Sequence, residues 1–383
     1  MVAPEPMGGV ARPASGSGPG AGADLETAGS AVGSGSGDGA GPAAGADLVV
    51  GSVGSAAESD SGAGADLETE SAGSAVGSGS VTGSAGPATD GDVPAWLAGL
   101  GIPGLIDLHT HFLPDRVLRK VWAYFDQAHT HYGVEWPIHY RHPEPTRLRM
   151  LRDLGVTTFA PLVYPHKPGM AAWLNDWALD FGRRTPGAVP TATMFPEPGA
   201  HDSLAAAVEA GARCVKVHVQ VGGFDPRDPL LDPAWGLLAE AGIPAVVHCG
   251  HGPLRGDHTG LEVFAEVLAR HPRLVAVLAH AGMPEYDEAL RMVEKYPRVH
   301  LDTTMVGVTF SEKMSPLPPD WPARLADLGD RVVLGTDFPN IPYPYAEQLA
   351  AIAGWAAADD RLGASFLRAV LHDTPGRLLG VLS

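Results

Sequence analysis

The sequence predicts an α/β protein, a (β/α)8 TIM barrel with a disordered Gly/Ala/Ser-rich N-terminal tail. Three observations lead to this fold class. Eight apolar runs alternate with helix-like segments. The steps between runs, about 20 to 35 residues, suit parallel βαβ units. The whole series spans about 290 residues, the size of one barrel. A doubly wound open sheet is the alternative, but no GxGxxG motif follows the first run to support it.

Residues 1–92 differ sharply from the rest of the chain. They contain twelve acidic residues and one basic residue, with no histidine and no aromatic residue, and the phrase Gly-Ala-Asp-Leu recurs at Gly22, Gly45 and Gly64. Such a composition buries too little apolar area to offset about 1–2 kcal/mol of backbone entropy per residue. We therefore expect a disordered tail over 1–92 and a barrel domain over 93–383.

Composition also excludes several classes of function. The formal net charge is −18, most of it carried by the tail, and neither part has a basic patch suited to nucleic acid or anionic lipid. No run of 18 apolar residues predicts a membrane span, and the N-terminus lacks the pattern of a signal peptide. Two cysteines cannot form a disulfide framework. A cytoplasmic protein with a small-molecule partner is expected.

The expected elements follow the apolar pattern along the chain. Strands are predicted at residues 104–111, 156–164, 189–195, 214–219, 243–248, 274–280, 299–303 and 332–336. Helices are predicted between them at 171–182, 203–212, 234–241, 261–270, 285–295 and 321–328, and two more at 345–355 and 365–371 close the barrel.

One connection is too long for an ordinary βα loop. About 45 residues separate the first strand from the second, and the stretch 122–149 is rich in aromatic residues and histidine. A loop after a barrel strand lies on the catalytic face, so this one could cover a site or contact a second subunit. A helical excursion that packs on the barrel explains the pattern equally well.

The first strand ends in two histidines one residue apart. Because side chains alternate along a strand, His109 and His111 are expected on one face, with Leu108 and Thr110 on the other. Two imidazoles on one face form a ready chelate for a metal. Histidine pairs at this spacing are common, however, so the remaining strand ends decide the interpretation.

Several other predicted strands also end in polar side chains: Lys216 and His218 on the fourth, His248 on the fifth, His280 on the sixth and Asp337 on the eighth. Active sites of barrels assemble at these carboxyl ends. Histidines and a carboxylate gathered in a low-dielectric site need partners, and one cation would serve them all.

The sequence therefore predicts a divalent metal. Three imidazole nitrogens and one carboxylate oxygen suit Zn²⁺ better than Fe²⁺, Mn²⁺ or Co²⁺. The predicted ligands are His109, His111, His248 and Asp337. His280 is placed beside the metal, where it can polarise a substrate oxygen or take part in proton transfer; Asp337 and His280 are the predicted catalytic groups.

These motifs resemble a known family. The phrases IDLHTHFLP, GIPAVVHCG, LAHAGMPEY and LGTDFPNIPYPY are similar to the amidohydrolase superfamily, most of all to the branch that contains aminocarboxymuconate-semialdehyde decarboxylase. The resemblance covers residues 94–382. It implies a metal-dependent barrel enzyme and a homodimer, but the branch includes hydrolases, lactonases and non-oxidative decarboxylases, so the reaction stays open.

Lys216 is ambiguous under this resemblance. In binuclear members of the superfamily, a lysine that closes strand four is carboxylated and bridges two metals. No such bridge is expected in the mononuclear branch. Lys216 and His218 would then bind an anionic group of the substrate, or Lys216 would reach solvent.

Hydrolysis of a small-molecule amide, ester or lactone is the predicted reaction. A divalent cation can lower the pKa of water to about 7, and Asp337 could accept the water proton and pass it to the leaving group. His280 or the metal would stabilise the oxyanion. The alternatives are a decarboxylase of a small aromatic or unsaturated carboxylic acid, which would use the same site, and a non-catalytic metal-binding protein.

Overall fold

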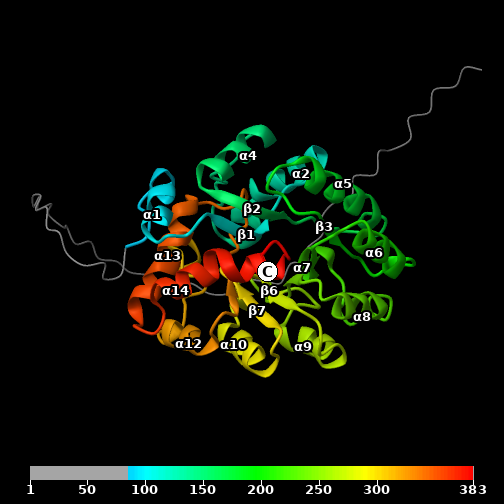
Figure 1. Ribbon diagram of the computed structural model, residues 1–383. Helices are drawn as coiled ribbons and strands as arrows, with labels where there is room; N and C mark the ends of the chain where they lie inside the picture. The colour runs from blue at the N-terminus through cyan, green and yellow to red at the C-terminus, as the bar shows by residue number, and fades with distance from the viewer. Residues whose placement is uncertain (1–84, 383) are drawn as a thin grey trace, which may run out of the picture. The chain divides into compact units, whose positions relative to one another are not determined.

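The computed structural model describes residues 85–382, so most of the predicted tail lies outside the described residues. Within this range, eight parallel strands form a barrel encircled by helices (Figure 1). The strands are β1 Leu105–Thr110, β2 Val156–Pro161, β3 Thr191–Thr193, β4 Cys214–His218, β5 Ala245–His248, β6 Ala276–Leu278, β7 Val299–Asp302 and β8 Val332–Val333. The predicted barrel is confirmed, and each strand lies within a run that the sequence predicts.

The barrel closes through two weak seams. Strands β3 to β8 form one sheet in chain order, and β1 pairs with β2. The backbone N–H of Val189 donates to Phe159 O at 3.0 Å, which joins β2 to the start of β3. On the other side, the N–H of Leu108 donates to Leu334 O at 2.9 Å, which joins β8 to β1. Every strand of the described part therefore has two neighbours, and no edge of these sheets is exposed.

Helices cover the outside of the barrel. They are α1 Val93–Gly99, α2 Asp115–Phe125, α3 Ala128–Tyr132, α4 Glu144–Asp153, α5 Ala171–Arg184, α6 Ala200–Glu209, α7 Val219–Gly222, α8 Asp232–Ala241, α9 Leu261–Arg270, α10 Tyr286–Lys295, α11 Thr309–Glu312, α12 Trp321–Leu328, α13 Tyr345–Ala358, α14 Gly363–Arg368 and α15 Thr374–Leu378. Three short non-α helices, η1 Asp90–Asp92, η2 Ala279–Gly282 and η3 Ala369–Asp373, complete the described part. Across these residues, no helix combines the length and apolar character needed to cross a membrane.

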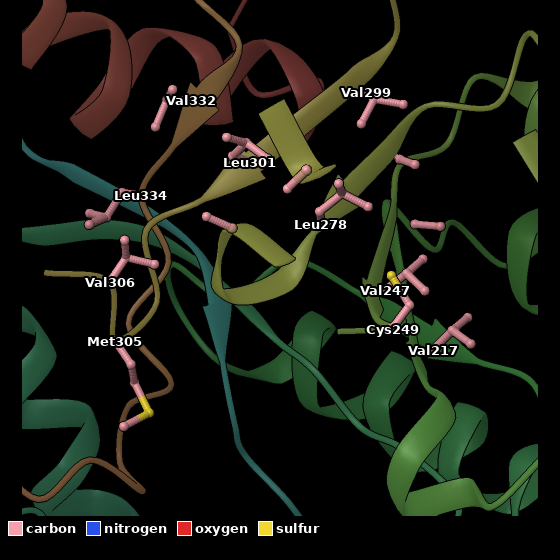
Figure 2. Close-up of a cluster of buried hydrophobic side chains, with 14 of the residues drawn as sticks. Val217, Val247, Cys249, Leu278, Val299, Leu301, Met305, Val306, Val332 and Leu334 are labelled. Carbon is pink, nitrogen blue, oxygen red and sulfur yellow. The ribbon is translucent and has the colours of Figure 1, made fainter. Parts of the chain in front are cut away.

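Alternation along the strands divides the core in two. Val217, Val247, Leu278 and Leu301 point outward and pack under the helices (Figure 2). Their neighbours in the sequence point inward, where Val246 and Val277 join Cys214 in a separate cluster inside the barrel. Inward positions nearer the carboxyl ends of the strands carry polar side chains. We call these carboxyl ends the mouth of the barrel.

The C-terminal segment seals the opposite end. His372 Nδ1–H donates to Gly104 O, just before β1, at 2.8 Å. Arg213, just before β4, donates to Gly380 O at 2.9 Å. Leu379 joins the inner apolar cluster, and the C-terminal helices lie across the middle of the barrel (Figure 1). The C-terminal segment thus covers the end of the barrel opposite the mouth.

A bulge in β1 sets which side chains reach the interior. The register shifts between Asp107 and Thr110, so that two residues of β1 face one residue of β2. As a result Leu108 packs in the inner cluster, although His109 also faces inward. The sequence prediction that Leu108 lies on the opposite face of the strand from His109 is wrong, because simple alternation does not hold across a bulge.

The long β1–β2 connection is helical and packs on the loop that follows β8. The indole N–H of Trp122 donates to Asn340 Oδ1 at 3.0 Å, and that of Trp136 donates to Asn340 O at 2.7 Å. Asn340 N–H in turn donates to Asp337 O at 2.8 Å. The connection thus braces the loop that carries the predicted catalytic carboxylate.

Residues just before the expected domain boundary contact the barrel. Asp90 accepts a hydrogen bond from the N–H of Ala346 at 2.9 Å and another from the hydroxyl of Tyr140. Gly86 lies so close to α13 that a Cβ there would sit 2.4 Å from Ala350 Cα. Contacts with the barrel thus begin before residue 93, where the sequence places the start of the domain.

Removing residues 1–92 should therefore destabilise the protein relative to removing residues 1–84. The longer truncation eliminates the two hydrogen bonds to the Asp90 carboxylate, for an expected loss of about 1–3 kcal/mol in the free energy of unfolding. Urea denaturation of both truncations measures the difference, and Asp90→Ala in the full chain should reproduce it. Equal stabilities of the two truncations would show that these contacts contribute nothing to the free energy of unfolding.

Candidate active site

The strand ends bring the predicted metal ligands together at the mouth. Asp337 Oδ1 lies 2.9 Å from His111 Nε2 and 3.3 Å from His109 Nε2. Ligand atoms of His109, His280 and Asp337 lie within 4.8 Å of one another. His280, predicted to stand beside the metal, is therefore placed as a possible ligand. His248 stays close, with its ring centroid 4.7 Å from that of His280.

Six aromatic side chains form a closed ring around the mouth, which we call the histidine ring. In order they are His109, His111, Tyr164, His218, His248 and His280, with successive centroids 5.1, 5.1, 5.1, 4.1, 4.7 and 5.5 Å apart. Tyr164 was missed at the sequence level, although it ends the predicted second strand. Examining the last polar residue of that strand would have found it.

Unusual backbone conformations place two of the polar groups. His280 and Asp337 have φ values of 56° and 66°, in the left-handed region that side-chain-bearing residues rarely adopt. Because Val277 and Ala279 both face the interior, regular alternation would turn His280 outward. Strain of this kind costs about 1–3 kcal/mol per residue and is typically found at functional sites.

A buried carboxylate supports the histidines from behind. Asp302 Oδ2 accepts a hydrogen bond from His109 Nδ1–H at 2.7 Å, and Oδ1 accepts one from the backbone N–H of His280 at 2.7 Å. Burial opposes ionisation, but the neighbouring His109 lowers the pKa of Asp302 to about 2. Asp302 closes β7, so the rule applied to the other strand ends would have identified it.

Carbonyl partners orient the remaining histidines. His111 Nδ1–H donates to Leu162 O at 2.9 Å, and His280 Nδ1–H donates to Thr304 O at 3.2 Å. His248 Nε2–H donates to Gly252 O at 2.8 Å. In each ring the other nitrogen is left with its lone pair, which is the form that binds a metal.

Burial also favours the neutral form of His109, His248 and His280. It lowers the pKa of His109 to about 4, with the nearby Lys216 adding to the effect. Burial likewise lowers the pKa of His280, and burial together with His280 holds the pKa of His248 well below its usual value. Neutral imidazoles at pH 7 are ready to bind a cation without first losing a proton.

Asp337 is the anionic centre of the mouth. Burial alone would raise its pKa, but the neighbouring His111 and His109 hold the pKa well below the usual value, so the carboxylate is ionised. Its Oδ1 contacts both histidines. Its Oδ2 has no hydrogen-bond partner among residues 85–382, and the side chain is 16% exposed. Oδ1 is thus the oxygen that lies against the histidine nitrogens, where a cation would join them.

Lys216 lies beneath the histidine ring rather than in solvent. It is fully buried, and its ammonium donates to His109 Nε2 at 2.8 Å. Burial lowers the pKa of Lys216 to about 8, although Asp337 and Asp302 oppose this shift. Because the ammonium uses the lone pair of His109 that would face a metal, Nζ must withdraw from Nε2 when a cation binds there.

Gly335 leaves room for this arrangement. A Cβ at this position would lie 2.6 Å from Thr304 Oγ1 and 2.8 Å from His109 Cβ. Gly335→Ala is therefore expected to displace the inner wall of the site and to cost about 1–3 kcal/mol in the free energy of unfolding. Thermal denaturation measures this loss.

Gly354 provides a matched control. It lies in the helix α13, and a Cβ there would meet nothing within 4 Å, so Gly354→Ala should stabilise the protein by about 0.5–1 kcal/mol. Equal melting temperatures for the two variants would contradict the close packing around Gly335.

The comparisons with known proteins agree with this geometry. The profile of the amidohydrolase family matches residues 106–381. The chain belongs to the amidohydrolase family. Members of this family generally depend on a divalent metal. A comparison with curated proteins found no match.

Solved structures resemble the chain at low identity. An uncharacterized TIM-barrel protein from Bordetella bronchiseptica is 17% identical, covers 72% of this chain and 98% of its own, and superposes with a TM-score of 0.52. The 5-carboxyvanillate decarboxylase of Sphingomonas paucimobilis is 13% identical over 73% of this chain and 99% of its own, with a TM-score of 0.46. The dihydroorotase of Campylobacter jejuni is 14% identical over 73% of this chain and 84% of its own, also with a TM-score of 0.46. The first structure supports the barrel fold; none of them indicates the reaction.

The residues of this amidohydrolase fit a divalent metal. Lone-pair nitrogens of histidines and an ionised carboxylate oxygen converge on one point, and carbonyl or carboxylate partners hold the histidines in place. The residues that would hold the metal are His109, His280 and Asp337, whose ligand atoms lie within 4.8 Å of one another. His111 Nε2 lies 2.9 Å from Asp337 Oδ1, and His248, also a predicted ligand, lies outside this group beside His280.

Proposed function

We propose that this amidohydrolase is a metal-dependent hydrolase of a small-molecule amide, ester or lactone. The observation that carries the proposal is the asymmetry of the Asp337 carboxylate. Oδ1 contacts two histidine nitrogens, whereas Oδ2 has no hydrogen-bond partner in the described part of the chain. A carboxylate with one oxygen against the metal-binding nitrogens can accept a proton on the other, as a general base must.

The proposed roles follow from where each group lies. A divalent metal in this site would supply an activated water and polarise the scissile carbonyl. Asp337 Oδ2 takes the proton of the attacking water and returns it to the leaving group. His280, fixed by Thr304 O through Nδ1–H, presents Nε2 to the mouth beside Asp337, where it assists that proton transfer.

Zinc is the metal that we propose. Nitrogen ligands outnumber oxygen ligands in the mouth, and no thiol contributes, since Cys214 and Cys249 are buried in the apolar core. A set dominated by imidazoles favours Zn²⁺ over Mg²⁺ or Ca²⁺, which prefer oxygen ligands.

The test is turnover in ¹⁸O-labelled water, with the headspace monitored for CO₂, on a panel of lactones, esters, amides and aromatic acids. The expected result is one ¹⁸O atom in a new carboxylate product and no CO₂. Stoichiometric CO₂ release, with solvent hydrogen on the vacated carbon, would overturn the hydrolase in favour of a decarboxylase. Asp337→Asn serves as the inactive control.

A further inference from the structure

One member of the histidine ring is oriented differently from the others. In His109, His111, His248 and His280, one ring nitrogen donates to a carboxylate or carbonyl oxygen. In His218 the direction is reversed, because the backbone N–H of Val221 donates to His218 Nδ1 at 3.3 Å. Nδ1 therefore carries the lone pair, and Nε2 carries the hydrogen.

This orientation makes His218 a hydrogen-bond donor toward the mouth. The side chain caps α7 through Nδ1, and its ring stacks on that of His248 with centroids 4.1 Å apart and an interplanar angle of 12°. A metal needs a nitrogen lone pair. Binding through Nε2 would require a hydrogen on Nδ1, which would then face the N–H of Val221, donor against donor.

Tyr164 provides a second donor beside the first. Its ring centroid lies 5.1 Å from that of His218 and 5.1 Å from that of His111. The hydroxyl makes no hydrogen bond within residues 85–382. A tyrosine hydroxyl is a neutral O–H at pH 7 and can donate a hydrogen bond.

Lys216 is not available as a further hydrogen-bond donor toward the mouth. Its ammonium is fully buried and donates to His109 Nε2. The two residues that the sequence grouped as possible second-metal or substrate-binding groups are therefore separated by the structure. Lys216 faces the metal ligands from below, and His218 lies in the wall of the mouth.

We propose that His218 Nε2–H and the Tyr164 hydroxyl bind an oxygen of the substrate that only accepts hydrogen bonds, and that His218 is not a metal ligand. The proposal rests on the hydrolase function inferred above and narrows its substrates to compounds that carry a carboxylate or a carbonyl on the side of β2 and β4. Both donors are neutral, and within residues 85–382 neither has an acceptor of its own, so they favour such an oxygen over an ammonium or a hydrocarbon.

The test uses benzoate and benzamide as probes of the full-length, zinc-loaded protein. Tyr164→Phe keeps the ring and removes only the hydroxyl. His218→Asn can still cap α7, because its side-chain oxygen can accept from Val221 N–H, but it loses the Nε2 donor. Calorimetry measures the affinity for each probe, and elemental analysis measures zinc in each variant; the titrations are repeated on the metal-free protein.

We expect both variants to keep the wild-type zinc content and to bind benzoate about tenfold more weakly, as for a lost hydrogen bond to a charged group. An equal loss of affinity for benzamide would show that the two donors bind any carbonyl oxygen. A loss of affinity confined to benzoate would show that they bind a carboxylate. Wild-type benzoate affinity in both variants overturns the proposal, as does loss of zinc from His218→Asn. A wild-type protein that binds zinc but hydrolyses nothing would instead contradict the proposed function alone.

Discussion

Asp337→Asn is expected to reduce kcat/KM by about 10²–10⁴-fold, the usual contribution of a positioned general base. Asparagine has nearly the same shape as aspartate, and its side-chain oxygen can take the place of Oδ1, which lies 2.9 Å from His111 Nε2 in the wild type. It cannot take a proton from water at the free Oδ2 position. The loss should therefore appear in kcat, while the melting temperature changes little.

Asp202→Asn is the matched control, because that carboxylate is 90% exposed and pairs with the surface residue His201. The control variant should retain wild-type kinetics. If Asp337→Asn kept kcat/KM within threefold of the wild-type value, Asp337 could not be the general base, and the proposed mechanism would have to be abandoned.

Asp302→Asn should weaken zinc binding by about 10- to 100-fold, the range seen when a supporting group behind a metal ligand is lost. Both oxygens of Asp302 accept hydrogen bonds, Oδ2 from His109 Nδ1–H and Oδ1 from the N–H of His280. An amide can accept through one atom only, so either the ring of His109 or the turn at His280 loses its partner.

Competition titration with a chromophoric zinc chelator measures the affinity of this variant. Asp330→Asn is the control, since that side chain is 66% exposed and pairs with Arg377 far from the ligands. Equal zinc affinity in the wild type and Asp302→Asn would show that His109 and His280 keep their positions without the carboxylate.

The barrel could be predicted from the sequence because its strands are buried on both sides. Runs such as 243–247 and 274–279 are continuously apolar, and the segments between the strands carry helical periodicity, so period and spacing are both visible. Strand ends were less accurate: β6 ends at Leu278, where the sequence predicts 280. There the backbone enters the left-handed region at His280, and composition alone does not indicate that turn.

Part of the site could be predicted because the fold brings the carboxyl ends of the strands together. The positions of His109, His111, His248 and Asp337 at strand ends follow from the fold. The direction of each hydrogen bond does not follow from the fold, because it depends on contacts between residues far apart in the chain. The supporting role of Asp302 and the reversed orientation of His218 both arise in this way.

The most direct test of the metal centre is elemental analysis of the purified full-length protein together with its His109→Ala/His111→Ala variant. We expect close to one divalent metal, zinc, per chain in the wild type and almost none in the double variant, because Asp337, His248 and His280 alone would hold the cation weakly. Two metals per chain that are lost together on Lys216→Ala would replace the single centre with a bridged pair. Full hydrolytic activity in protein that binds no metal would contradict the central claim.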